Sequence, residues 1–188
     1  KTRVVAVISH WLEHKEKARL QEFEIEALET AMDTQLMGIP LKLRIDRIDR
    51  IGDKRLVIDY KTGSIDGKTL NSDSLTEPQL PIYALAASDE APVDGVMLAQ
   101  LRKPDDLKVH LRSNWANSVI AKRSHDNDVD SPEKWQAELD AWERALQTMA
   151  EGILAGNIAH DYNTQLDRSF SAYLLPLLRE ASTAEDEA

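Results

Sequence analysis

The stretch Leu41–Thr62, LKLRIDRIDRIGDKRLVIDYKT, predicts two β-strands joined by a tight turn. Residues 42–51 alternate charged and apolar side chains, and residues 55–61 are rich in β-branched and aromatic ones, as is typical of strands. The dipeptide Gly52-Asp53 between them suits a two-residue type II′ turn, which prefers glycine first. We expect this hairpin at the centre of the fold, because both of its faces carry apolar residues. One face is expected to carry Ile45, Leu56 and Ile58, and the other Ile48 and Val57.

The register of this hairpin brings two carboxylates together. If Gly52 and Asp53 form the loop, counting back along both strands places Asp46 opposite Asp59, with Cβ atoms about 5 Å apart. Lys61 points to the same face as Asp59. Two carboxylates that close favour a compensating cation, and hard ions such as Mg²⁺ take carboxylate ligands. An ordinary half-exposed hairpin with cross-strand ion pairs fits the spacing equally well.

Three segments within 41–87, DRIDRI, VIDYKTG and PQLPIYALA, resemble the RecB-type branch of the PD-(D/E)xK nucleases. That branch includes the nuclease domains of the RecB and AddB helicase–nucleases, and the likeness is greatest to AddB-like DNA repair proteins of bacteria. The family's G-x-x-D segment falls on 43–46, where Leu43 replaces the usual glycine. Its D-x-K segment falls on 59–61, and its Q-x-x-x-Y motif begins at Gln79.

The resemblance implies an α/β fold in which helices flank a restriction-endonuclease-like mixed central β-sheet, with 1–188 as a single domain. It implies a Mg²⁺- or Mn²⁺-dependent deoxyribonuclease, with exonuclease as the expected type, in a DNA repair or recombination protein. The expected partners are DNA and a helicase–nuclease subunit, and the expected location is the cytoplasm. Because the chain begins at Lys1 and not at Met, we expect a C-terminal fragment of a longer protein.

The resemblance also implies a role for each residue of the first two motifs. Asp46 and Asp59 are expected to bind the metal, with the backbone carbonyl of Tyr60 as a further ligand. Together with Lys61 they form the expected catalytic set. The lysine would orient the attacking water or bind the phosphate.

The third motif lies on a helix expected over 79–87, since proline at position 78 suits a first turn. Gln79 and Tyr83 are four residues apart and share one face of that helix. The resemblance implies that both position the substrate strand. The alternative is that Tyr83 is ordinary packing and Gln79 a surface residue.

A helix is also expected over 4–20, and His10 and His14 would share one of its faces. The family's first motif is a helical histidine that completes the metal site, and the resemblance places it at His10. Two exposed helix histidines are the more common arrangement, however. The true motif could equally precede Lys1.

Composition limits the classes of function. The net charge of −10 at pH 7 is unfavourable for gripping nucleic acid over the whole surface. Residues 1–63 carry 12 Lys/Arg and 11 Asp/Glu, whereas residues 64–188 carry 11 and 22. We therefore expect DNA to enter through a cleft or from a partner. The chain has no cysteine, which excludes disulfides and a thiolate-bound iron–sulfur cluster, and no apolar run of about 18 residues, so no membrane association is expected.

The remaining chain predicts further elements around the hairpin. A strand is expected over 22–32, with a helix as the alternative, and an antiparallel pair over 93–102 and 107–112. Residues 62–78 predict a loop, either a flap beside the site or an ordinary connection. A helix with a tryptophan-bearing apolar stripe is expected from Ser131 to residue 155. A shorter apolar helix is expected within 170–179.

A second class of function competes with the nuclease. The chain would then be a catalytically inactive nuclease-fold domain that serves as a structural or DNA-binding arm of a helicase–nuclease complex. The acidic charge and the missing iron–sulfur cysteines favour this alternative. The complete set of Asp46, Asp59 and Lys61 argues against it.

Overall fold

The computed structural model describes residues 2–19, 21–65, 67–72, 75–115, 125–126 and 131–156. Six strands form one sheet in the order β1-β2-β3-β4-β5-β6. They are β1 (Glu24–Leu36), β2 (Ile39–Ile51), β3 (Lys54–Lys61), β4 (Gly95–Leu101), β5 (Leu107–Ser113) and β6 (His125–Asp126). The helices are α1 (Thr2–Trp11), which continues into a π-helical turn η1 (Leu12–Glu16), a short 3₁₀ turn η2 (Gly67–Leu70), α2 (Gln79–Ser88) and α3 (Pro132–Leu154).

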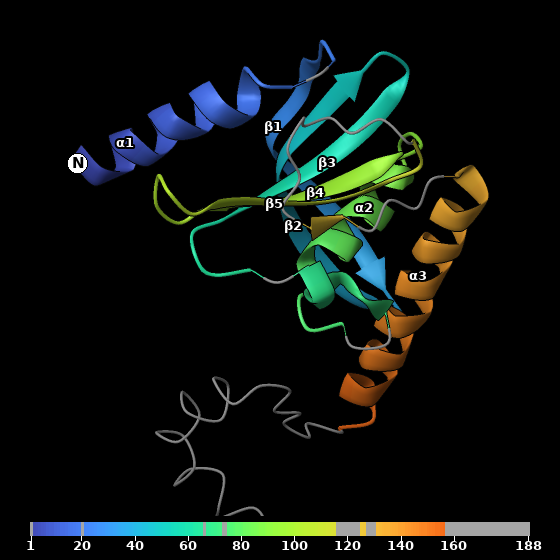
Figure 1. Cartoon of the computed structure of the whole chain (residues 1–188). Coiled ribbons are helices and arrows are strands. Elements are labelled where there is room, and N and C mark those ends of the chain that lie inside the picture. Colours follow the sequence, from blue (N-terminus) through green and yellow to red (C-terminus); the bar gives the residue numbers. More distant parts are fainter. Residues whose placement is uncertain are drawn as a thin grey trace, which may run out of the picture.

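The sheet is mixed, which confirms the expected α/β fold with helices around a central sheet. Neighbouring strands are antiparallel except for β3–β4 and β5–β6, which are parallel. A parallel pair requires a crossover connection, and α2 provides it between β3 and β4. Figure 1 shows α1 on one side of the sheet and α2 and α3 on the other.

The central hairpin has the predicted turn and register. Ile51 pairs with Lys54 across the turn, and Gly52 has a φ of 61°, the left-handed conformation that glycine tolerates at the first position of such a turn. The sequence Gly38-Ile39-Pro40 predicts a turn before this hairpin, and the structure places that turn one residue earlier. Met37 and Gly38 both have positive φ there, and Leu36 pairs directly with Ile39.

Two apolar clusters cover the two faces of the sheet. One contains Val57 of β3 together with side chains of α2 and α3, and the other contains Leu56 and Ile58 of β3 together with Trp11 of α1. The expected distribution was wrong at one residue, because Ile45 lies in the cluster of Ile48 and Val57. These two isoleucines are three residues apart, so the regular alternation of β2 breaks between them.

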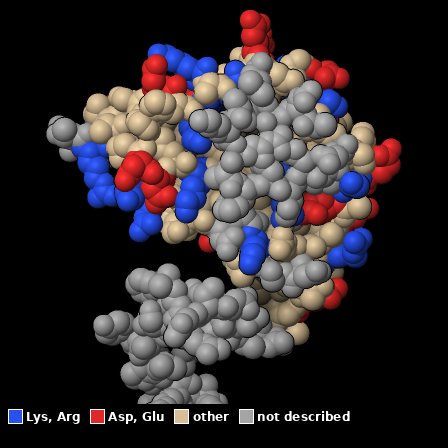
Figure 2. Space-filling model, viewed as in Figure 1, with Lys and Arg blue, Asp and Glu red and all other residues tan. Residues whose placement is uncertain are grey.

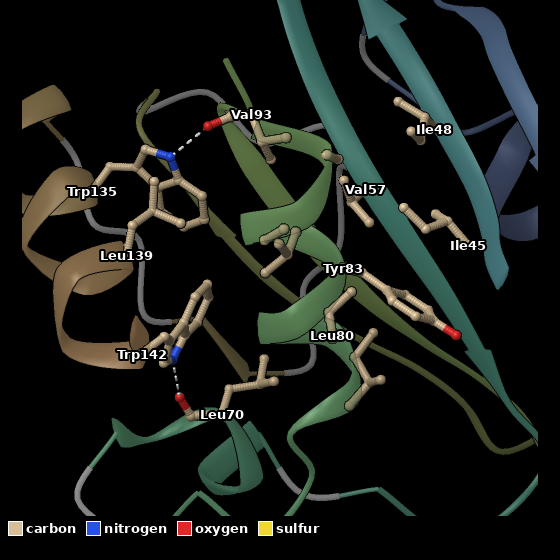
Figure 3. Close-up of a cluster of buried hydrophobic side chains, with 14 residues drawn as sticks. Ile45, Ile48, Val57, Leu70, Leu80, Tyr83, Val93, Trp135, Leu139 and Trp142 are labelled. Carbon is tan, nitrogen blue, oxygen red and sulfur yellow. Dashed lines mark hydrogen bonds between the residues drawn. The ribbon is translucent and has the colours of Figure 1, made fainter. Parts of the chain in front are cut away.

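The tryptophan-bearing helix is core, as its apolar stripe predicts. Ser131 caps its N-terminus by accepting a hydrogen bond from the backbone N–H of Lys134. Trp135 donates to the carbonyl of Val93 at 2.6 Å, and Trp142 donates to the carbonyl of Leu70 at 2.8 Å, as Figure 3 shows. The indole N–H groups therefore hold α3 against the segment before β4 and against η2.

Other boundaries differ from the sequence prediction. The first strand extends over 24–36, because it pairs with β2 along its length, and the helix expected over 4–20 divides into α1 and η1. Residues 62–78 contain η2 and so are not entirely loop. The helix expected within 170–179 lies outside the described residues. No helix in the described ranges is long and apolar enough to cross a membrane.

Gly95 on β4 lies where the sheet has no room for a side chain. A Cβ atom there would lie 2.8 Å from Cβ of Ser113 and 2.9 Å from the carbonyl oxygen of Arg112. Gly95→Ala is therefore expected to lower the free energy of unfolding by about 2–3 kcal/mol. Gly152→Ala on α3, where the new Cβ has no neighbour within 4 Å, should instead raise it by about 0.5–1 kcal/mol. Urea unfolding of both variants checks the pair, and equal stabilities would contradict the packing argument.

Candidate active site

Asp46 and Asp59 lie where strands β2 and β3 stop pairing. The last pair of their ladder is Arg47 with Ile58, so both carboxylates come immediately beyond it. Instead of a ladder pair, Oδ2 of Asp46 accepts a hydrogen bond of 2.9 Å from the backbone N–H of Tyr60. The side chain of Asp46 thus replaces the missing backbone contact between the two strands.

The irregularity in β2 explains how Asp46 reaches this position. Ile45 and Ile48 pack in one cluster although alternation would separate them, so the backbone departs from regular strand geometry between them. Asp46 lies in that interval. Asp59 remains in a regular strand and shares the face of Val57, which is the face that α2 covers.

The expected catalytic lysine connects the strands to helix α2. Nζ of Lys61 lies 3.1 Å from Oδ2 of Asp59 and also donates a hydrogen bond to Oε1 of Gln79. Nε2 of Gln79 in turn donates to the hydroxyl of Tyr83 at 2.6 Å. The structure therefore joins four of the predicted residues in one continuous chain of polar contacts.

Tyr83 combines packing with this polar role. Its ring is buried in the cluster between the sheet and α2. Figure 3 shows its hydroxyl at the end of the ring that points away from Trp135 and Trp142. The ring therefore anchors the hydroxyl, and the hydroxyl orients Gln79.

Burial changes the acidity of Asp59. Its side chain is only 1% exposed, and burial raises its pKa above the ordinary value. Lys61 opposes this shift, whereas the negative charges of Asp46 and Glu77 add to it. Buried acids with raised pKa values are concentrated at functional sites.

Glu77 is a neighbour of the site that sequence reasoning missed. The sequence pattern assigns no role to Glu77, yet its negative charge raises the pKa of Asp59. The available signal was its position two residues before Gln79. Its side chain is exposed, so it adds negative potential at the solvent side of the site.

The two carboxylates fit a hard divalent cation. Oδ2 of Asp59 is buried, and the Lys61 ammonium lies 3.1 Å from it. Burial of a carboxylate is costly, and a divalent cation would offset more of that cost than Lys61 does alone. Among the residues that the structure describes, no group of three or more His, Cys, Asp or Glu side chains is placed to hold a metal. Two carboxylates are enough protein ligands for Mg²⁺ or Mn²⁺, because water and phosphate oxygens complete the coordination of these ions.

His10 does not join the carboxylates. Its ring lies 4.0 Å from that of His14, centroid to centroid. The helix that carries it, α1, packs through Trp11 on the face opposite α2, whereas Asp59 lies on the α2 face. The expectation that His10 contributes a metal ligand therefore has no support in this geometry, because helical spacing does not reveal which face of a sheet a helix covers.

The family model of the PD-(D/E)XK nuclease superfamily matches residues 1–165. The chain belongs to this superfamily. PD-(D/E)XK enzymes are nucleases, and they generally use divalent metals. Membership in this nuclease superfamily implies DNA as the class of substrate. The sequence of this superfamily member contains a D-x-K segment at residues 59–61.

One solved structure is similar over most of the chain. It is titled "Crystal structure of SSO0001" and is 18% identical, with a TM-score of 0.42. The match covers 92% of this chain and 66% of that one, so this chain spans slightly less than two thirds of its length. None of the curated proteins matches this PD-(D/E)XK chain.

Proposed function

We propose that this chain is the nuclease domain of a RecB/AddB-like DNA repair or recombination protein. It hydrolyses phosphodiester bonds of DNA with Mg²⁺ or Mn²⁺ and acts as an exonuclease. The observation that carries the proposal is the buried carboxylate of Asp59, which Lys61 contacts at 3.1 Å and on which the negative charge of Asp46 also acts. Burial of an acid beside a second acid and one lysine is costly, and binding of a divalent cation would offset that cost.

Each residue of the candidate site has a separate role in hydrolysis. Asp46 and Asp59 would hold the divalent ion, with the Tyr60 carbonyl as a further ligand. The bound ion would lower the pKa of a water molecule and neutralise charge on the phosphate. Lys61 donates its N–H groups either to the attacking water or to a phosphate oxygen.

Gln79 and Tyr83 act on the reaction through Lys61. Lys61 has two acceptors, the carboxylate of Asp59 and the amide oxygen of Gln79. Tyr83 fixes the amide of Gln79 in turn. A lysine held at two points loses less conformational freedom when substrate binds, which favours catalysis.

The charge distribution supports delivery of DNA by a partner. In Figure 2, Lys and Arg side chains are interspersed with Asp and Glu on the described part of this face. With a net charge of −10, long-range attraction of DNA is weak. We therefore propose that a helicase–nuclease subunit in the cytoplasm feeds the strand to Asp46, Asp59 and Lys61.

Metal binding and cleavage test the proposal directly. Calorimetric titration should detect Mn²⁺ binding by the wild type at about 1 mM or below, with Mn²⁺-dependent degradation of linear DNA. Asp46→Asn should weaken Mn²⁺ binding by about tenfold or more, because it replaces a charged ligand with a neutral one. Asp53→Asn, on the exposed turn of the same hairpin, is the matched control and should bind and cut as the wild type does.

Two results separate the alternatives. Absence of Mn²⁺ binding and of cleavage by the wild type would favour the inactive nuclease-fold arm. A covalently closed circular duplex should resist the wild type, because an exonuclease requires an end. Cleavage of that circle at the rate of linear DNA would instead identify an endonuclease.

A further inference from the structure

A buried network of charged side chains lies behind the candidate active site, on the face of the sheet that carries Trp11. Its centre is the guanidinium of Arg47 on β2. Asp49 accepts two hydrogen bonds from it, of 2.5 Å from Nε and 2.9 Å from Nη2. Glu16 in η1 accepts a third from Nη1, at 3.1 Å. Arg47 is thus held rigidly from two sides.

Further contacts fix the two acids of this network. Trp11 donates its indole N–H to Oε1 of Glu16 at 3.0 Å. Nη1 of Arg19 lies 2.5 Å from Oδ2 of Asp49. The side chains of Asp49 and Arg19 are 0% and 2% exposed. Two arginines and two carboxylates balance in charge, so the network can exist in a dry environment.

This network reaches the candidate active site through Tyr60. Nη1 of Arg47 donates a hydrogen bond of 3.1 Å to the Tyr60 hydroxyl. Tyr60 is the middle residue of the D-x-K segment, so its side chain points away from the face of Asp59 and Lys61. Its backbone N–H donates to Asp46 at 2.9 Å. Tyr60 is therefore held by two successive residues of β2, Asp46 at its backbone N–H and Arg47 at its hydroxyl.

These two contacts occupy a place where the backbone makes none. The β2–β3 ladder ends at the pair of Arg47 and Ile58, immediately before Asp46 and Asp59. Beyond it, the separation of the two strands depends on side chains. Tyr60 makes two such contacts, one with Asp46 and one with Arg47.

We propose that Arg47 and Tyr60 are positioning residues that hold Asp46 and Asp59 at the separation a divalent cation requires. The buried network keeps Arg47 in place, Arg47 keeps the Tyr60 ring in place, and the Tyr60 backbone orients the Asp46 carboxylate. Metal affinity therefore depends on a contact on the opposite face of the sheet. The inference rests on the proposed metal-dependent nuclease function and adds the residues that preorganise its site.

A purely structural role for Arg47 is the competing explanation, and Arg55 offers a matched control. Both arginines are buried, 7% and 6% exposed, and they lie on the two strands of one hairpin. Arg55 donates to Glu26 at 2.9 Å and to the carbonyls of Ala87 and Ala91. Its partners lie outside the candidate site. Loss of either guanidinium should therefore destabilise the fold to a similar extent. Only the loss of the Arg47 guanidinium should change the positions of the Asp46 and Asp59 carboxylates.

The test measures Mn²⁺ affinity, kcat, KM for DNA and melting temperature for the wild type and three variants. Arg47→Met and Arg55→Met should lower the melting temperature to a similar extent. Arg47→Met should also weaken Mn²⁺ binding by about tenfold and lower kcat, with little change in KM for DNA. Arg55→Met should bind Mn²⁺ as the wild type does. Tyr60→Phe, which removes only the hydroxyl, should weaken Mn²⁺ binding several-fold.

The possible outcomes test the positioning role of Arg47 and Tyr60 separately from the proposed nuclease function. If Arg47→Met binds Mn²⁺ as tightly as Arg55→Met, the positioning role is overturned while the nuclease function stands. If Arg47→Met does not fold, Tyr60→Phe decides, and unchanged Mn²⁺ affinity in that variant overturns the inference. If the wild type neither binds Mn²⁺ nor cleaves DNA, the proposed function fails and this inference fails with it.

Discussion

Asp59→Asn is expected to lower kcat for DNA cleavage by about 10³-fold. The same substitution should make the metal-free protein more stable. The loss follows because asparagine is a neutral, poorer ligand for a hard cation. The gain follows because the carboxylate is almost completely buried and burial raises its pKa. Asparagine has no ionisable group whose charged form must be desolvated, so function here opposes stability.

The pH dependence of this effect has a defined sign. Because the folded-state pKa of Asp59 is raised, the group favours folding when it is protonated, below its unfolded pKa of about 4. That contribution is lost as the pH rises through the folded-state pKa. The stability advantage of Asp59→Asn should therefore grow from pH 4 upward and level off above the raised pKa. Thermal unfolding of both proteins in EDTA across that range measures it.

Addition of metal should reverse the order of stability. Mn²⁺ at about 100 times its dissociation constant stabilises a protein by about 2.7 kcal/mol, and only the wild type has the complete site. The melting temperature of the wild type should therefore rise with Mn²⁺, and that of Asp59→Asn should not. A variant that is less stable than the wild type without metal, or that responds equally to Mn²⁺, would refute the assignment of Asp59.

Lys61→Met is expected to lower kcat by about 10²–10³-fold without weakening metal binding. Methionine retains the length of the side chain but has no charge to donate to water or phosphate. Nζ of Lys61 lies 3.1 Å from Oδ2 of Asp59, the oxygen that a cation would bind, so its removal should leave Mn²⁺ affinity equal or higher. Single-turnover cleavage with saturating Mn²⁺ measures the loss.

Lys54→Met on the same strand is the matched control. Lys54 also forms an ion pair of 3.1 Å, with Asp94, but at the turn end of β3. Its loss should leave kcat unchanged. Equal rates for Lys61→Met and the wild type would remove Lys61 from the mechanism, whereas a loss of Mn²⁺ binding would show that its role is to shape the site.

Local features of the molecule could be predicted because the residues that decide them are contiguous. The Gly52-Asp53 turn fixes the hairpin register through backbone geometry alone, and the ladder has that register from Ile51–Lys54 to Arg47–Ile58. Helix α3 likewise follows from its N-cap serine and its apolar stripe. The D-x-K and Q-x-x-x-Y motifs indicated four residues that the structure joins in one chain of contacts.

Contacts between residues far apart in the sequence decided which face of the sheet each side chain occupies. Local sequence patterns carry no information about such contacts. Periodicity shows that a helix has an apolar face but not which side of a sheet it covers, so it did not reveal that α1, which carries His10, packs through Trp11 on the face opposite α2. Alternation predicted Ile45 on the wrong face, because β2 leaves regular geometry beside Asp46.

The sequence by itself therefore determined the hairpin, its register and the positions of the D-x-K and Q-x-x-x-Y motifs, since each depends on neighbours along the chain. Only the tertiary structure decided that Lys61 meets Gln79, and that Arg47 joins Glu16 and Asp49 behind Tyr60. The physical reason is that desolvation and ion pairing depend on what packs together in space, and burial turns ordinary charged residues into a preorganised site.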